Sequence, residues 1–225
     1  MTRDDNRASA RRLVAQHLAR GDALGWFDAL YLEAQGHADR IPWADLQPNP
    51  YLANWLGGTA LSPQRALVVG CGLGDDAELL ASLGWSVVAF DVSAEAVRWA
   101  RQRFPQSKVE YVVADLFEPP RQWERAFNLV LEIYTLQALP VPLRARAVPM
   151  IAQSVAPNGV IFLFARGREE LDPPGEMPWP LTEREVRTFV DTGLVCRSLE
   201  DFMDDQTPPV RRFRAVFQRP AGPAE

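Results

Sequence analysis

The sequence has the composition of a globular protein with one core: of its 225 residues, 47% are hydrophobic and 24% are charged. A formal net charge of -5 gives no basic field for nucleic acid, and no apolar run reaches the length of a membrane span. The first twelve residues are polar, unlike a signal peptide, and the two cysteines have no metal-ligand spacing. We therefore expect a cytoplasmic protein without nucleic-acid, membrane or metal partners.

Three helices are expected in the first part of the chain, at 7–20, 24–34 and 51–56. Apolar runs then predict strands at 66–70, 86–91, 109–114, 127–132 and 159–165, and helices are expected between them at 75–83, 93–103 and 142–155. Ser93 is expected to be the N-cap of the helix at 93–103, and Thr182 and Glu185 have the spacing of a capping box for a helix at 182–192. Residues 194–203 and 210–218 alternate like the strands of a closing β-hairpin.

This order of elements predicts an α/β fold. We expect a doubly wound, mostly parallel, Rossmann-like sheet with an antiparallel C-terminal hairpin and an N-terminal helical lid. The chain should form a single domain, in which the helices of residues 1–58 pack on a core of residues 59–225. Ligands of such sheets bind at the carboxyl ends of the parallel strands, so the residues at those ends are the candidate site.

The most informative segment is the turn Gly70-Cys71-Gly72-Leu73-Gly74, which follows the first predicted strand. Glycines let a ligand approach the backbone closely, because no Cβ stands in the way. A dinucleotide-binding turn has the pattern G-x-G-x-x-G, which would place a third glycine at position 75. Asp75 and Asp76 stand there instead, and their carboxylates would repel a pyrophosphate. The turn therefore favours a nucleoside with a cationic tail, such as S-adenosylmethionine (SAM).

Acidic residues follow three of the predicted strands: Asp91, Asp115 and Glu132. Because the strands are expected to be neighbours in one sheet, these acids should belong to one shared site with the glycine turn. Asp91, at the tip of the second strand, is expected to accept hydrogen bonds from both ribose hydroxyls while lying outside the hydrophobic core.

The combination resembles the class I SAM-dependent methyltransferases. Val69–Gly74 matches their glycine motif, and Pro157-Asn158-Gly159 is similar to the turn before their fifth strand. The resemblance implies an acid on the ribose, an acid on the adenine, and a segment after the fourth strand that faces the methionine part and the acceptor. The cofactor-binding residues that it implies are Trp43, Gly70, Cys71, Gly72, Asp91, Val92, Asp115, Leu116, Glu132 and Ile133. The family often has an acid where Val68 stands, which leaves Asp75 or Glu132 to hold the SAM ammonium.

Two aromatic segments are similar to a narrower group, the thiopurine S-methyltransferase-like and tellurite-resistance methyltransferases. They are Trp26–Tyr31 and Ile41–Pro50, and in that group the N-terminal aromatics cover the bound SAM. Phe27, Tyr31 and Trp43 are the candidates in this chain. The residues that we expect to contact the acceptor are Tyr31, Tyr134 and Arg166.

We therefore expect an enzyme that transfers a methyl group from SAM to a small molecule and releases S-adenosylhomocysteine (SAH). Neither His17 nor His37 lies in the predicted core, which favours a soft acceptor such as a thiol over an oxygen that needs a base. No catalytic residue is assigned. The alternatives are an NAD-dependent oxidoreductase and a non-catalytic SAM-binding regulator, and either a monomer or a homodimer is expected.

Overall fold

Seven strands carry the fold, in the sheet order β3-β2-β1-β4-β5-β7-β6. The computed structural model describes residues 3–222. Its contacts divide the chain into a first unit, Met1–Gln64 with Gly70–Asp115, and a second unit, Arg65–Val69 with Leu116–Glu225. The α/β class, the mostly parallel sheet and the antiparallel C-terminal strands confirm the predicted fold. Within the described residues, no helix is both long enough and apolar enough to cross a membrane.

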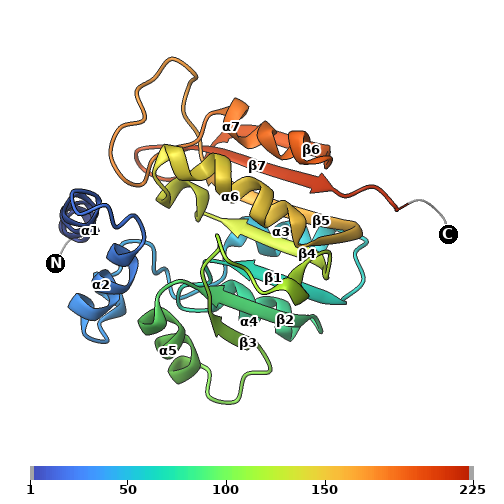
Figure 1. Cartoon of the computed structure of the whole chain (residues 1–225), viewed down its shortest axis with the longest axis horizontal. Helices are drawn as coiled ribbons and strands as arrows, with labels where there is room; N and C mark the ends of the chain where they lie inside the picture. The colour runs from blue at the N-terminus through green and yellow to red at the C-terminus, as the bar shows by residue number, and fades with distance from the viewer. Residues whose placement is uncertain (1–2, 223–225) are drawn as a thin grey trace. The chain divides into compact units, whose positions relative to one another are not determined.

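The first unit consists of helices packed on a parallel pair of strands (Figure 1). Its elements are α1 (Arg3–Leu18), α2 (Gly25–Ala34), a short 3-10 helix (Ala38–Arg40), α3 (Pro50–Gly58), α4 (Asp75–Ser82), β2 (Ser86–Asp91), α5 (Ala94–Arg103) and β3 (Glu110–Val113). Figure 1 shows α5 alongside β2 and β3, and α1 alongside α2. All of β2 except Ser86 is buried, as expected for a central parallel strand that is covered on both faces.

The ends of α5 show why this helix forms where it does. Ser93 is its N-cap and accepts a hydrogen bond from the N–H of Ala96, as the sequence predicted. Asp28, on α2, accepts further hydrogen bonds from the Ser93 hydroxyl at 2.7 Å and from the Glu95 N–H at 3.0 Å. The carboxylate of one helix therefore caps the positive end of another, and this fixes α2 against α5.

The second unit has parallel strands that continue into an antiparallel hairpin. Its elements are β1 (Arg65–Val69), a 3-10 helix (Arg121–Trp123), β4 (Phe127–Ile133), a 3-10 helix (Leu136–Ala138), α6 (Val141–Gln153), β5 (Val155–Arg166), α7 (Glu183–Arg187), a 3-10 helix (Thr188–Thr192), β6 (Val195–Met203) and β7 (Arg211–Gln218). The register of β1 and β4 sets Val69 opposite Glu132. From Val160 to Ala165, every residue of β5 is buried, which makes this strand the centre of the unit.

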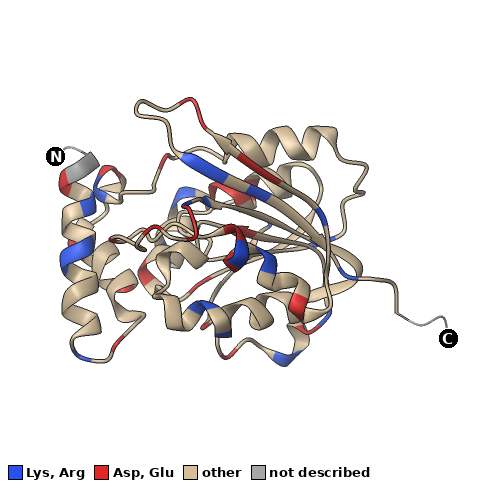
Figure 2. Cartoon of the chain, turned by 90° about the horizontal axis from the view of Figure 1, so that it is seen from above, with Lys and Arg blue, Asp and Glu red and all other residues tan. Residues whose placement is uncertain are grey.

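The hairpin of β6 and β7 is polar on its outer face. Arg211 pairs with Asp201, and Arg214 pairs with Glu200, across the two strands. Figure 2 shows basic and acidic segments side by side along neighbouring strands of the sheet. Charged side chains of this kind protect an edge strand from pairing with another chain.

Several boundaries differ from the sequence expectation, beginning with the helix predicted at 7–20, which is α1 at Arg3–Leu18. The predicted helix at 142–155 ends at Gln153, and β5 begins at Val155, four residues before the predicted strand. The expected turn at 157–159 is an irregularity inside β5, where Asn158 has a φ of 61° and the β4–β5 register shifts. The predicted helix at 182–192 is α-helical only over Glu183–Arg187 and continues as a 3-10 helix, although its capping box is confirmed.

Candidate functional site

The glycine turn has a conformation that only glycine fits without strain. Gly72 has a φ of 51°, and a Cβ on it would lie 3.2 Å from the Tyr31 hydroxyl oxygen. Gly74 has a φ of 90°, and a Cβ on it would lie 2.3 Å from the Tyr111 hydroxyl oxygen. The Cys71 N–H donates to the Phe90 carbonyl at 2.8 Å, which ties the turn to the end of β2. The turn therefore presents bare backbone at Gly72, as a closely approached ligand requires.

Asp91 holds the glycine turn in place. One carboxylate oxygen accepts from the Gly72 N–H at 2.9 Å, and the other accepts from the Ser93 N–H at 2.9 Å. The residue is only 7% exposed, and burial raises the pKa of its carboxyl above the ordinary value despite these donors. The expectation that Asp91 lies outside the core was wrong, because the turn that it supports closes over it. The Val92 N–H also acts on this carboxylate and favours its charged form, and acceptor capacity for a ligand remains.

Two of the predicted aromatics lie at the same turn. The Trp43 indole N–H donates to the Tyr31 hydroxyl at 3.1 Å, and the two rings meet edge to face at 6.3 Å. Tyr31 is 1% exposed, and burial raises the pKa of its hydroxyl well above the ordinary value. The structure thus brings Tyr31, Trp43 and Gly72 together. Phe27 instead stacks on Trp26 at 3.9 Å, as a packing residue of α2.

The acids after the turn have structural partners. Arg103 binds Asp75 through two hydrogen bonds of 2.7 and 2.8 Å and also donates to the Leu73 carbonyl. Asp76 accepts from the Asn49 N–H at 2.7 Å, and burial raises the pKa of its carboxyl to about 6. Arg103 therefore compensates the charge of Asp75 within the first unit, and the raised pKa of Asp76 makes its charge costly there. The argument that they repel a pyrophosphate loses its force, and Asp75 is not available to hold an ammonium group.

The tips of β2 and β3 lie side by side. The Ala114 N–H donates to the Asp91 carbonyl at 3.1 Å, and Asp115 follows directly. Val92 and Asp115 are half-buried. In the first unit, the predicted residues Asp91, Val92 and Asp115 are thus neighbours, as the sequence indicated.

In the second unit, Glu132 is a fully buried acid at the carboxyl end of β4. It is 0% exposed, and its Oε1 accepts from the Leu136 N–H at 2.8 Å. Its Oε2 has no hydrogen-bond partner within the described residues. Burial raises the pKa of this carboxyl to about 7, although the N–H groups of Leu136 and Thr135 and the charge of Arg144 act against the rise.

Tyr134 follows in a strained conformation, with a φ of 66°. Its N–H donates to the Phe164 carbonyl at 3.0 Å, and its ring meets the Phe164 ring edge to face at 5.6 Å. Arg212, which is paired with the buried Asp204, lies over the Tyr134 ring at 5.6 Å. The contacts with Phe164 and Arg212 hold Tyr134 in place. Ile133, which ends β4, is half-buried.

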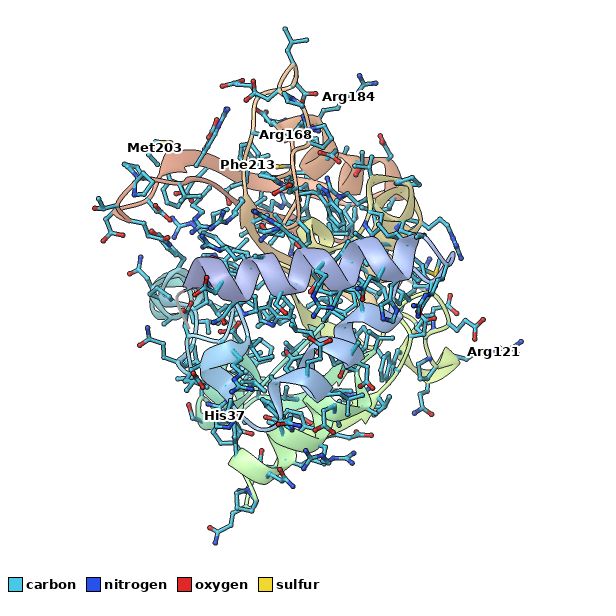
Figure 3. The ribbon with its side chains drawn as sticks, turned by 90° about the vertical axis from the view of Figure 1, so that its left-hand side faces the viewer. His37, Arg121, Arg168, Arg184, Met203 and Phe213 are labelled. Atoms are coloured by element: carbon cyan, nitrogen blue, oxygen red, sulfur yellow. The ribbon has the colours of Figure 1, made fainter. Side chains whose placement is uncertain are left out.

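The turn after β5 is hydrogen-bonded to two other segments of the second unit, near Gln137 and near Leu181. The Arg166 N–H donates to the Gln137 side-chain oxygen at 2.7 Å, and the Leu181 N–H donates to the Arg166 carbonyl. The Arg168 guanidinium binds the carbonyls of Pro180 and Asp172. Figure 3 labels Arg168 on this loop and Phe213 on β7. The side chain of Arg168 thus holds the loop, and the role of Arg166 toward an acceptor stays a prediction.

Sequence reasoning missed several residues that position these groups: Asp28, Arg103, Tyr111 and Arg144. Arg144 is 4% exposed and binds Glu185 at 2.6 Å and the Trp179 carbonyl at 2.8 Å. Among these residues and their partners, only Glu185 could be singled out from the sequence, because it belongs to the predicted capping box. The other pairs join residues far apart in the chain, such as Asp75 and Arg103. Among the described residues, no group of three or more His, Cys, Asp or Glu side chains could hold a metal ion.

Comparisons with known proteins agree with this geometry. A family model described as a methyltransferase domain matches residues 66–159. A probable thiol methyltransferase 2 of Arabidopsis thaliana is 27% identical over 75% of this chain and 74% of its own length. A ubiquinone biosynthesis O-methyltransferase of Alkalilimnicola ehrlichii is 35% identical over 68% of this chain and 61% of its own length. The alignment with the same enzyme of Thiobacillus denitrificans spans about half of that relative, 52%.

Solved structures show the same fold. A protein studied for the conversion of a disulfide bond into a thioacetal group during echinomycin biosynthesis has a TM-score of 0.71 and 19% identity, over 86% of this chain and 90% of its own. TehB from Haemophilus influenzae has a TM-score of 0.63 and 12% identity, over 76% of this chain and 62% of its own. Residues 66–159 thus match a methyltransferase domain, the chain is similar to proteins named as methyltransferases, and its fold is that of SAM-dependent methyltransferases.

Proposed function

We propose that this enzyme transfers the methyl group of SAM to a small-molecule acceptor whose reacting atom is soft, a thiol above all. The observation that carries the proposal is the arrangement in the first unit, where Asp91 pins bare backbone at Gly72 under Tyr31 and Trp43. A turn that only joins a strand to a helix would not need open backbone beside an acid and two aromatic rings, whereas a bound nucleoside would.

The residues of the first unit fit SAM. A Cβ at Gly72 would fill the space beside Tyr31, so glycine there keeps the backbone open to a ligand. Asp91 has spare acceptor positions for ribose hydroxyls, and Asp115 lies at the next strand tip for the adenine amino group. Tyr31 and Trp43 would exclude water. The roles of Cys71, Val92, Leu116, Ile133 and Glu132 toward the cofactor belong to the same proposal.

When bound, SAM supplies an electrophilic methyl group on a sulfonium, so the protein needs to align and desolvate the acceptor rather than activate the donor. In the second unit, the half-buried Tyr134 offers aromatic surface to a small, polarisable acceptor, and the half-buried Arg166 ends the adjoining strand β5. Aromatic walls with few polar groups are typical of small-molecule sites.

A thiol is favoured because it needs little help from a base, since its thiolate fraction near neutral pH is appreciable. His17 lies on α1 and pairs with Asp22 at 2.7 Å, and we assign it no role as a base. The thiol methyltransferase relative supports the same acceptor. The O-methyltransferase relatives support a second candidate, a phenol-like oxygen acceptor. A cytoplasmic setting and a monomeric or homodimeric state are further proposals, and they rest on composition.

The test is the rate of SAH release with a matched series of a thiol, a phenol and an amine that share one aromatic scaffold. We expect the thiol to be fastest, with a rate that rises with pH and levels near the pKa of the bound thiol. A clearly faster phenol would refute the thiol assignment and leave the methyltransferase in place. Calorimetry should show tight binding of SAM and SAH and weak binding of NAD. The reverse order would refute the cofactor, and SAH binding without turnover of any acceptor would favour a regulator.

A further inference from the structure

Tyr134 is held in a backbone conformation that a bulky side chain does not favour. Its φ of 66° lies in the left-handed region, where the Cβ is crowded by the following carbonyl. Its N–H donates to the Phe164 carbonyl at 3.0 Å, which fixes the strained residue to β5. Strain of this kind persists only where the surroundings enforce it, and it is concentrated at functional sites. The contacts that hold the Tyr134 side chain therefore bear on function.

A buried cation from another strand contacts the Tyr134 ring. The guanidinium carbon of Arg212, on β7, lies 5.6 Å from the centre of the Tyr134 ring and 5.8 Å from the centre of the Phe164 ring. Arg212 is only 3% exposed, and a cation attracts an aromatic ring more strongly where water is excluded. Arg212 thus joins the C-terminal hairpin to the residue that follows β4.

Asp204 fixes the position of Arg212. The Arg212 Nε donates to Oδ2 of Asp204 at 2.8 Å, and Nη2 lies 2.8 Å from the same oxygen. The other oxygen, Oδ1, accepts from the N–H groups of Gln206 at 3.2 Å and Val210 at 2.8 Å. Burial acts to raise the pKa of the Asp204 carboxyl, but these donors outweigh it and lower the pKa. One charged carboxylate therefore folds the turn between β6 and β7 and holds the guanidinium.

The pair lies beside both predicted acceptor contacts at the strand ends of the second unit. Arg212 contacts Tyr134 and is directly opposite Arg166 in the register of β5 and β7. Figure 1 shows β4, β5 and β7 as neighbours in that order. Closing the hairpin does not require a buried ion pair, since Arg214 and Glu200 join the same two strands nearer the surface. Taking two charges out of water is costly, so the buried pair needs another reason.

We propose that Arg212 is a positioning residue of the acceptor site, which holds the Tyr134 ring as a fixed wall for an aromatic acceptor. The inference rests on the proposed function, because it takes Tyr134 as an acceptor contact and a thiol as the reacting group. A fixed aromatic ring packs better on another aromatic ring than on a saturated ring of similar size. The enzyme therefore prefers thiols that carry an aromatic ring, and this preference depends on the charge of Arg212.

The experiment compares the KM of benzyl mercaptan with that of cyclohexylmethanethiol, its saturated counterpart, from rates of SAH release at saturating SAM. The unmodified enzyme should have a KM about 3- to 10-fold lower for benzyl mercaptan, the range for one aromatic pair. The variant is Asp204→Asn with Arg212→Gln, which removes both charges together so that neither is left buried and unpaired. Its preference should fall below about twofold, because the Tyr134 ring loses the cation that holds it. Its Kd for SAH, measured by calorimetry, should not change, because neither residue is a predicted cofactor contact.

The matched control is Glu200→Gln with Arg214→Gln, which neutralises the more exposed pair of the same two strands and should keep the preference. A second comparison leaves Arg212 in place. Tyr134→Gly should unfold at a higher urea concentration than Tyr134→Ala, because glycine adopts a φ of 66° without strain. Both variants should lose the preference for benzyl mercaptan, because neither carries the ring.

The outcomes separate this inference from the proposed function. Equal KM values for the two thiols on the unmodified enzyme, or an unchanged preference in the Asp204–Arg212 double variant, would show that Arg212 has only a structural role, and the thiol assignment would stand. Equal unfolding of Tyr134→Gly and Tyr134→Ala would show that no strain is held at Tyr134, which also overturns the inference. If neither thiol is methylated, the proposed acceptor fails and the inference fails with it. Poor folding of the double variant would not protect the inference, because the unmodified enzyme and the Tyr134 variants can each refute it.

Discussion

Gly74→Ala tests how the glycine turn is packed, because the cost of this change has two separable parts. The backbone part comes from the φ of 90°, which an L-residue adopts at a cost of about 1–2 kcal/mol. The packing part comes from the new Cβ, which would lie 2.3 Å from the Tyr111 hydroxyl oxygen and 3.0 Å from the carbon that bears it. Overpacking of this kind costs about 1–3 kcal/mol, so the total should be about 2–5 kcal/mol.

Two further variants separate the parts. Gly84 also has a φ of 90°, but a Cβ on it would meet nothing nearer than Pro63 at 3.7 Å. Gly84→Ala should therefore cost only the backbone part. Tyr111→Phe removes the atom at 2.3 Å and gives up one hydrogen bond to Glu78, worth about 0.5–1.5 kcal/mol. In the Tyr111→Phe background, the cost of Gly74→Ala should fall toward that of Gly84→Ala.

The assay is urea unfolding of the unmodified protein, the three single variants and the double variant, with the free energy of unfolding taken from each curve. We expect a coupling of about 1–3 kcal/mol between positions 74 and 111, with the double variant less damaged than the two single costs imply. Equal costs for Gly74→Ala and Gly84→Ala, together with no coupling to Tyr111, would refute the reasoning.

Three more predictions follow from buried groups. Asp91→Asn should weaken SAH binding at least about tenfold and also lower stability, because only one side-chain oxygen remains for the donors of Gly72 and Ser93; calorimetry with urea unfolding checks both, and unchanged affinity would mean that the ribose is held elsewhere. Burial raises the pKa of the Glu132 carboxyl to about 7, so its charged form destabilises the folded protein. The unmodified protein should therefore lose up to about 3 kcal/mol of stability relative to the Glu132→Gln variant as the pH rises from about 4.5 through about 7. A difference in the free energy of unfolding that does not change with pH would contradict this. Arg144→Met should cost about 1–3 kcal/mol, because the carbonyls of Leu139 and Trp179 lose a buried donor and Glu185 keeps only the more distant Arg168 at 3.5 Å. Arg214→Gln, at the more exposed pair with Glu200, should cost under about 1 kcal/mol; similar unfolding midpoints for the two variants would count against the buried pair.

Much of the fold could be predicted because its signals are local. Apolar runs bounded by glycine or acid indicate central strands, and β2 was placed to the residue at Ser86–Asp91. The N-cap at Ser93 and the capping box at Thr182 were read from short spacings and are confirmed. The start of β5 was missed, since the strand begins directly after α6 without a glycine or proline between them.

The candidate site was predictable in its residue types but not in its pairing. The acid at position 91 was found, yet its burial was not, because that depends on a turn closing over it. Asp75 was interpreted as a free charge, since nothing in the local sequence shows Arg103, which is 28 positions away, binding it. Such ion pairs arise from packing of helices on strands, and a single sequence carries no record of them.

The hydrogen bonds of Asp28 have a consequence for exchange at the cofactor site. Asp28 and Tyr31 belong to the same turn of α2, so the helix that carries the aromatic cover is also the helix that caps α5. Tyr31 further meets Trp99 of α5 edge to face at 5.6 Å. Lifting α2 would strip the positive end of α5 of its carboxylate and break the ring contact at the same time. A movement of α2 away from α5 therefore has to break the hydrogen bonds of Asp28 and the Tyr31–Trp99 ring contact at the same time.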